Sequence, residues 1–290
     1  MNRTESLLRT AELSVERFDH PPGDVHHDPD HEIGETFSLA FVTHGHFAVH
    51  AVTPGRRAST PLEAGGILLL HPGLRFRCQH AEQCPSDICV SVRFTDAAVV
   101  GVEDAWTATP WVARTEATPR LAFVQHQLTR AIARRDALAV EQWALAGIDA
   151  LERDTHGPRG AYAAPRAELD AVLAACDAID ADPARRISVA ERAHAVSLTA
   201  LRLTRAFRRH VGIAPHQYVV RQRLRRAADL LAAGASVTDA CYASGFESLS
   251  HFVRSFHRTF AVRPSAWRSL PLLAQRAQIV RIGQAPAPKA

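Results

Sequence analysis

Short apolar runs separated by turn signals characterise the first third of the chain. Four apolar stretches of strand length alternate with turns that contain glycine: 37–42, 47–52, 67–70 and 88–94, with His44-Gly45, Pro54-Gly55, Ala64-Gly65-Gly66 and Pro72-Gly73 between or beside them. Short strands at this even spacing are typical of a small sandwich or barrel. We therefore predict an all-β unit over residues 32–100.

The apolar spacing becomes helical after residue 118. Apolar residues then recur three or four positions apart, with a break near 134–136: Leu121, Val124, Leu128, Ile132, Leu138, Trp143, Leu145, Ile148 and Leu151. This periodicity predicts two helices over 118–155, because one face of each would be apolar. The stretch 155–166 that follows is rich in glycine and proline, which predicts a linker.

The rest of the chain, to about residue 269, is predicted to be helical. Start and stop signals outline its elements: Ser188 with Glu191 as a capping box, Thr199 as an N-cap, Pro215 at a helix start, Gly234 at its end, Ser236 as an N-cap, Gly245 in a turn, Glu247-Ser248 at a helix start, and Pro264 before a last short helix that carries Trp267. A short helix, a tight turn and a longer helix thus occur twice. The segments 205–208 and 254–257 correspond at a separation of 49 residues. Such units are typical of helix-turn-helix motifs, whose second helix enters the DNA major groove.

Charge is distributed unevenly along the chain. Residues 181–270 contain 15 arginines, no lysine and 5 acids, a net charge of +10, whereas residues 1–180 contain 16 cations and 25 acids, a net charge of −9. The basic part suits a polyanionic partner. A proteome that favours arginine would explain why lysine occurs once. It would not explain why acids are scarce after residue 180.

The C-terminal motifs resemble the signature of AraC/XylS transcription regulators. The resemblance is carried by residues 245–256 (GFESLSHFVRSF), Phe260, Arg263-Pro264-Ser265 and Trp267-Arg268, and by the segment 223–227. Four positions depart from the family pattern: Arg192 replaces an apolar residue, Ser197 a turn glycine, Ala261 a glycine and Trp267 a tyrosine. The resemblance covers about 166–269. It implies two helix-turn-helix units on a rigid connecting helix that contact successive major grooves on one DNA face.

Helical geometry and the family motif predict which residues face the DNA. The predicted contacts are Leu201, Arg202, Thr204, Arg205, Arg208, Leu249, Ser250, Val253, Arg254 and Arg258. Arg205 and Arg254 are the preferred base readers, because arginine can hold guanine through two hydrogen bonds. Arg208 and Arg258 are predicted phosphate contacts. The alternatives are solvated or phosphate-bound arginines and, for the apolar residues, ordinary helix packing instead of contact with thymine methyl groups.

The N-terminal half resembles, less specifically, the cupin-like sensory domain of AraC relatives. The residues that carry this resemblance are His44-Gly45-His46 between two strands and the segment 65–73 (GGILLLHPG). Barrels of this kind hold small ligands. The resemblance implies an effector-binding barrel, with the helices at about 118–152 as the dimerisation element.

A metal site is the alternative use of the N-terminal histidines. His44 and His46 alternate as in metal cupins, and His71 and His80 could join them, but no carboxylate follows His46 at the metal-cupin distance. A second cluster suits metal binding or oxidant sensing, or consists of cysteines that serve as small buried residues: Cys78, His80, Cys84 and Cys89. We predict no metal, cofactor or catalytic residue.

The predicted fold class is α+β multidomain, with an N-terminal cupin-like β-barrel and dimerisation helices and a C-terminal all-α domain with two helix-turn-helix units. The predicted segments are 1–155 (effector sensing and dimerisation), 156–166 (linker), 167–270 (DNA binding) and 271–290 (flexible tail). Five cysteines, an odd number, argue against a disulfide framework, and no apolar run has the length of a bilayer span or a signal peptide. We therefore expect a cytoplasmic protein without a membrane partner.

The predicted function is a sequence-specific transcription factor that is not an enzyme. Its expected partners are double-stranded promoter DNA, an unknown small-molecule effector, a second copy in a homodimer and, by family resemblance, RNA polymerase. Activation is the commoner mode in the family, and repression is the alternative. Two rivals are a metal-dependent cupin enzyme with an appended helical domain and a non-specific architectural DNA binder.

Overall fold

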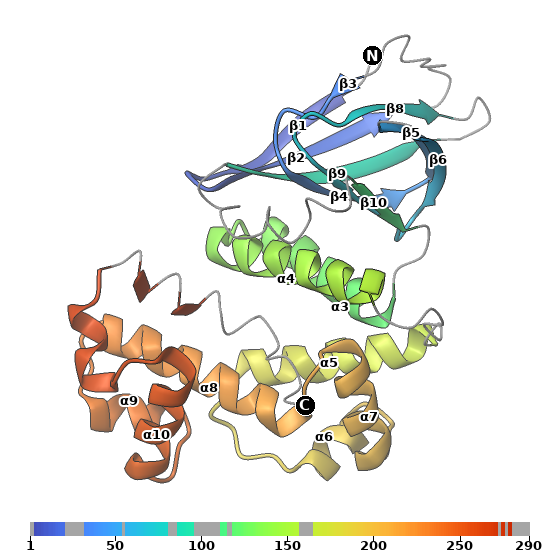
Figure 1. The fold of residues 1–290 in the computed structure, drawn as a ribbon. Coiled ribbons are helices and arrows are strands. Elements are labelled where there is room, and N and C mark those ends of the chain that lie inside the picture. Colours follow the sequence, from blue (N-terminus) through green and yellow to red (C-terminus); the bar gives the residue numbers. More distant parts are fainter. Residues whose placement is uncertain are drawn as a thin grey trace. The chain divides into compact units, whose positions relative to one another are not determined.

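The computed structural model describes residues 3–20, 32–53, 56–80, 86–95, 111–114, 118–156, 165–271, 274–275 and 278–279. The chain divides into two compact units, Met1–Ala161 and Tyr162–Ala290. Within these described residues, the first unit contains two β-sheets and two helices, and the second is helical (Figure 1). The predicted α+β class is therefore confirmed. No helix of the described residues has the length and apolar character required to span a membrane.

Two antiparallel sheets build the cupin-like part of the first unit. The six-stranded sheet has the order β1 (Arg3–Arg9), β2 (Leu13–His20), β9 (Asp87–Phe94), β4 (Ser38–His44), β7 (Ile67–Leu70) and β10 (Trp111–Arg114). The four-stranded sheet has the order β3 (Glu32–Ile33), β8 (Arg75–His80), β5 (His46–Thr53) and β6 (Arg56–Glu63). The four predicted strands correspond to β4, β5, β7 and β9. The remaining strands of the two sheets were not predicted from the sequence.

The central strands of the six-stranded sheet are buried on both faces. In β4, Leu39 and Phe41 belong to the core that includes the two helices, whereas Ala40 and Val42 belong to the core between the sheets. Side chains alternate between the faces of a strand, so a strand covered on both sides has a continuous apolar sequence. This explains the uninterrupted Ile67–Leu70 run of β7, which is divided between the same two cores.

Two helices cover the outer face of the six-stranded sheet (Figure 1): α3 (Pro119–Ala133) and α4 (Ala137–His156). The side chain of Thr118 accepts a hydrogen bond from the Leu121 backbone N–H and so caps α3. The predicted break between the helices is confirmed, with Arg135 at φ 53°. Gly147 lets α4 approach the sheet, because a Cβ there would lie 2.9 Å from Leu39 Cδ2.

The second unit, where described over residues 165–271, consists of α-helices and one 3-10 helix. They are α5 (Arg166–Ala181), α6 (Val189–Ala195), α7 (Ala200–His210), α8 (Pro215–Ala232), α9 (Val237–Ala243), α10 (Leu249–Phe260) and the 3-10 helix η1 (Pro264–Ser269). The predicted N-caps Ser188, Thr199 and Ser236 each accept a hydrogen bond from a backbone N–H of the first turn. The start signals in the sequence therefore act as local physical chemistry predicts.

Candidate nucleic-acid interface

The first helix-turn-helix unit is formed by α6 and α7. The capping box closes in both directions: the Glu191 N–H donates to Ser188 Oγ at 3.2 Å, and the Ser188 N–H donates to Glu191 Oε2 at 2.8 Å. Ser197 makes the turn in the left-handed region, at φ 57°. The Leu198 N–H then donates to the Ala193 carbonyl at 2.8 Å, which holds the turn against the end of α6.

Helix α7 separates an apolar face from a basic one. Leu203, Ala206 and Phe207 are buried against the domain core. The opposite face exposes four arginines and a leucine: Arg202, Arg205, Arg208, Arg209 and Leu201. Thr204 is half-buried, and its hydroxyl donates to the Ala200 carbonyl at 2.8 Å. An exposed leucine beside arginines is suited to a partner that is both anionic and partly apolar, such as a DNA groove.

The second unit, α9 and α10, makes its turn with a glycine that the structure requires. Gly245 has φ 91°, and a Cβ on it would lie 2.6 Å from Ala184 Cα. A side chain at this position would therefore be strained and would also collide with backbone. The side chain of Ser248 caps α10 by accepting from the His251 N–H at 3.4 Å.

Helix α10 is anchored by a cluster of aromatic rings in edge-on and tilted contact. Phe256 lies at its centre, with ring centroids 5.5 Å from Phe252, 4.4 Å from Phe260 and 5.4 Å from Trp267. Trp267, which departs from the family pattern, is fully buried in this cluster. The opposite face exposes Leu249, Ser250, Arg254 and Arg258, with Val253 half-buried.

The structure thus places the predicted contacts in two groups, one on α7 and one on α10. Eight of the ten are exposed, and Thr204 and Val253 are half-buried. Ordinary helix packing, the alternative for the apolar residues, does not fit Leu201, which is 60% exposed. DNA contact by each residue stays a prediction.

A connector, residues 182–186, links the two helix-turn-helix units through its contacts with α8 and with the turn of the second unit. The Arg223 Nε–H on α8 donates to the Pro183 carbonyl at 2.7 Å. Arg186 of the connector pairs with Glu247 in the turn of the second unit at 3.1 Å. The connector leads directly into α6, so these contacts link the start of one unit to the turn of the other. The connector could not be predicted from the sequence, because backbone carbonyl acceptors leave no signal there.

Arg192 is the unusual residue of the first unit. It is 6% exposed, although it lies on the face of α6 that the family pattern makes apolar. Its guanidinium donates to the Arg185 carbonyl at 3.4 Å. Burial lowers the pKa of Arg192, and the positive charges of Arg223 and Arg185 lower it further. Burial of this charged side chain therefore lowers the stability of the first helix-turn-helix unit. The described residues of the second helix-turn-helix unit, 236–260, include no buried charged side chain.

The family comparison identifies a known domain within this helical unit. Residues 192–269 match the family model HTH_18, described as a helix-turn-helix domain. The HTH-type transcriptional activator RhaS of Shigella boydii is 41% identical over 69 residues, which is 23% of this chain and 25% of RhaS. The HTH-type transcriptional regulator CdhR of Pseudomonas aeruginosa is 38% identical over 97 residues, which is 33% of this chain and 28% of CdhR.

This chain belongs to the AraC/XylS family. A solved structure with 30% identity, a probable AraC family transcriptional regulator from Rhodopseudomonas palustris, aligns with a TM-score of 0.33 and covers 34% of this chain and 95% of that one. The chain covers about a quarter to a third of the length of the curated relatives that it matches. Each match to those relatives covers a third of this chain or less.

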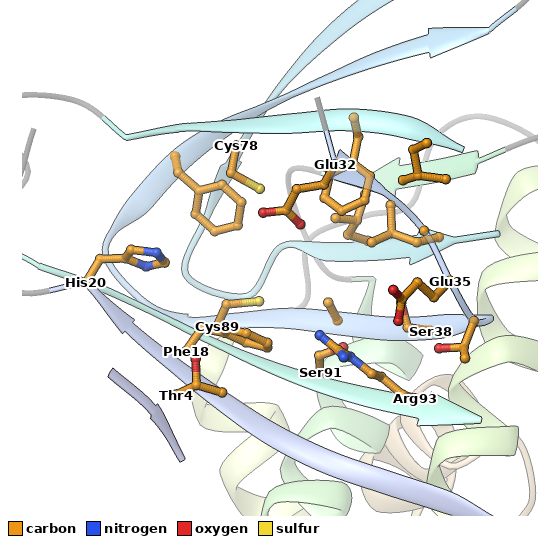
Figure 2. A pocket seen from close by; sticks show the side chains of 18 of the residues that line it. Thr4, Phe18, His20, Glu32, Glu35, Ser38, Cys78, Cys89, Ser91 and Arg93 are labelled. Carbon is orange, nitrogen blue, oxygen red and sulfur yellow. The ribbon is translucent and has the colours of Figure 1, made fainter. Parts of the chain in front are cut away.

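The N-terminal unit of this AraC/XylS protein contains a cavity of about 620 Å³ lined by residues of both sheets. Figure 2 shows His20 near one end and Arg93 with Glu35 near the other. The Arg93 guanidinium pairs with Glu16 at 3.3 Å and lies 5.7 Å from the centre of the Phe18 ring. The volume is within the range of small-molecule sites, about 300–1,000 Å³.

The predicted cysteine cluster is only partly described. Cys78 of β8 and Cys89 of β9 both line the cavity (Figure 2), whereas Cys84 lies outside the described residues. Burial raises the pKa of Cys89 to about 12, and the nearby charge of Asp87 contributes. The thiol of Cys89 is therefore protonated at neutral pH, which disfavours oxidant sensing by this residue.

The histidines considered for a metal site lie in different places. His44 and His46 are exposed where β4 ends and β5 begins, whereas His71 packs edge-on against Phe37 at 5.0 Å. Burial lowers the pKa of His71. In the part of the chain that the structure describes, the three side chains whose potential ligand atoms lie within 4.8 Å of one another are instead His20, His80 and Asp87. Only His80 had been considered from the sequence.

Proposed function

We propose that this protein is a sequence-specific DNA-binding transcription regulator whose helices α7 and α10 enter two successive major grooves. The observation that carries the proposal is the duplicated outward face. Two helix-turn-helix units with separate buried anchors expose Arg205 and Arg254 at corresponding positions. The names of the matched relatives support regulation over the cupin-enzyme alternative.

The connecting helix supports simultaneous engagement of both units. Helix α8 has 18 residues, so its length is about 27 Å at about 1.5 Å per residue. Major grooves on one DNA face recur every ~34 Å. Contacts of the connector with α8 and with the second turn restrict relative movement of the units. A single chain would therefore read two groove segments without a palindrome.

The proposal assigns regulation to the N-terminal segment 1–155. An effector of small-molecule size would occupy the cavity between the sheets, whose lining combines apolar and charged side chains. Dimerisation would use α3 and α4, which cover the sheet with one face and expose residues such as His126 and Thr129 on another. We further propose promoter activation through RNA polymerase, with repression as the alternative, and assign 156–166 as linker and 271–290 as a tail. Flexibility along this whole tail does not fit Gln275, which is buried and donates to the Trp267 and Leu270 carbonyls.

Alanine variants test the assignment of readers and phosphate contacts. On a selected DNA site, Arg205→Ala or Arg254→Ala should each cost about 1–3 kcal/mol in binding and relax the preference at one base position. Arg208→Ala should weaken selected and random DNA about equally and reduce the salt slope by about one. Arg166→Ala, an exposed arginine on α5, is the control.

Quantitative gel shifts at several salt concentrations provide these measurements. Equal losses on selected and random DNA for Arg205, Arg254 and Arg208 would mean that all three bind phosphate only.

Hydroxyl-radical footprinting then tests the tandem arrangement. Inserting about five base pairs, half a helical turn, between the two groove segments should abolish tight binding. Tight binding that survives the insertion would show that at most one unit engages DNA.

A further inference from the structure

Two histidines and an aspartate meet near the end of the cavity marked by His20 in Figure 2. His20 is the last residue of β2 and pairs in register with Asp87, the first residue of β9. Directly opposed residues of antiparallel strands place their side chains on the same face. His80 ends β8, which belongs to the other sheet. The cluster therefore joins the two sheets.

The three side chains approach closely through specific atoms. His20 Nδ1 lies 2.9 Å from one carboxylate oxygen of Asp87, and His80 Nδ1 lies 2.8 Å from the other. The two imidazole rings stack with centroids 4.0 Å apart. One atom from each residue can be chosen so that all three lie within 4.8 Å of one another. This is the close grouping of donors that a metal ion requires.

The two histidines contact different oxygens of the Asp87 carboxylate. His80 Nδ1 and Asp87 Oδ2 form a buried hydrogen bond. His20 Nδ1 and Asp87 Oδ1 lie 2.9 Å apart as an ion pair, and neither atom has a further hydrogen-bond partner among the described residues. The side chain of Asp87 is only 2% exposed. Buried polar atoms in native proteins are nearly always satisfied, so a buried pair of atoms with no further partner is a candidate for binding an ion.

We propose that His20, His80 and Asp87 bind a divalent transition-metal ion, with zinc as the best match. Imidazole nitrogens and carboxylate oxygens are ligands that suit zinc, and three protein ligands leave a fourth tetrahedral position for water or another donor. Bond lengths of ~2.0–2.2 Å imply ligand atoms about 3.3 Å apart. The observed 2.8–2.9 Å contacts would therefore widen by a small side-chain movement when the ion replaces protons.

The position of the ion explains what it would do. His20 and His80 also line the cavity, so the open coordination position is available to solvent or to a molecule held there. The ion would tie β2 and β9 of one sheet to β8 of the other. Binding to the folded state alone would stabilise the N-terminal unit by mass action. The site differs from the exposed His44–His46 pair expected by analogy with metal cupins.

Metal titration of the purified full chain tests the site. The sequence contains three further histidines outside the described residues, His26, His27 and His31, which could bind metal adventitiously. All three are therefore changed to glutamine in the background protein. Zinc is measured after dialysis and by calorimetry, and Co²⁺ serves as a spectroscopic probe of tetrahedral coordination. We expect one ion per chain, a tetrahedral Co²⁺ spectrum and a higher Tm with zinc.

The ligand variants are His20→Gln and Asp87→Asn, and the matched control is His44→Gln with His46→Gln. Each ligand variant should weaken zinc binding by at least about tenfold, whereas the control should not. Circular dichroism identifies any variant that fails to fold, and the partly accessible His20 provides the safer substitution. No bound zinc, or binding unchanged in folded His20→Gln, would mean that the cluster is only a hydrogen-bonded network and would overturn the proposal. DNA binding by the background protein is measured in a separate assay. A failure of the proposed DNA-binding function can therefore be distinguished from a failure of the proposed metal site.

Discussion

The two helix-turn-helix units share their outward chemistry but differ in their inward packing. Both begin with a serine cap and expose arginines along the second helix. The first buries Arg192 and makes its turn with Ser197, whereas the second makes its turn with Gly245 and rests on an aromatic cluster. The comparison shows that the exposed face and the core of such a unit can vary independently, because different faces of the same helix carry them.

The turns of the two helix-turn-helix units place different steric demands on the residue with positive φ. Ser197 is exposed, so its cost comes from the left-handed backbone alone, at φ 57°. Gly245 has the connector against it and has no room for a Cβ. The second turn also contains one additional residue: the first-helix caps Ser188 and Ser236 are 48 residues apart, whereas the second-helix caps Thr199 and Ser248 are 49 apart. Glu247, which lies in this longer turn, forms the ion pair with Arg186.

The largest expected effect is that of Gly245→Ala. The left-handed backbone and the collision with Ala184 should together lower the free energy of unfolding by about 2–4 kcal/mol. Gly234→Ala is the matched control, because Gly234 also has a positive φ, 104°, but its Cβ would approach nothing closer than 3.9 Å. Chemical denaturation of the full chain measures both. Equal losses would show that the connector yields and does not constrain the second turn.

A smaller effect of opposite sign is expected for Arg192→Leu. Removing a buried guanidinium that has charged neighbours of the same sign should raise the free energy of unfolding by about 1–2 kcal/mol. Arg185→Leu is the control, since Arg185 is exposed and its substitution should change stability little. Calorimetric Tm values compare the two. A destabilised Arg192→Leu variant would indicate that the hydrogen bond to the connector outweighs the burial cost.

The smallest effect is expected for Ser197→Gly. Relief of the left-handed backbone should stabilise the first unit by about 0.5–1 kcal/mol. Ser197→Ala keeps a Cβ and should leave the stability nearly unchanged, which separates backbone strain from loss of the hydroxyl. Thermal unfolding of the three proteins in parallel is the measurement. If glycine is no better than alanine, the difference between the two turns is one of packing only.

The helical unit was predictable because its signals are local. Caps, turn residues and apolar spacing lie within a few positions of the element that they define, as Ser188 and Glu191 show. The β-unit was predicted only at its most apolar strands, β4, β5, β7 and β9. β2 has mixed polarity and is stabilised by β9, about 70 residues further along the chain, so its local sequence has no comparable signal.

The candidate sites divide in the same way. The outward positions of α7 and α10 follow from helical periodicity, so sequence analysis could predict which residues are exposed. The cluster of His20, His80 and Asp87 depends on the register of β2 with β9 and on the approach of a second sheet. The contact of Arg223 with the Pro183 carbonyl spans 40 residues and uses a backbone acceptor that every residue type provides.

The length of α8 makes the chain sensitive to insertions at positions that touch no ligand. One residue added within Pro215–Ala232 would turn everything after it by about 100° and advance it by about 1.5 Å. Arg223 could then no longer meet the Pro183 carbonyl while α10 kept its direction. Point substitutions on the solvent side of α8 preserve this phase, whereas a single inserted codon destroys it. Among homologues, α8 should therefore vary in sequence much more readily than in length.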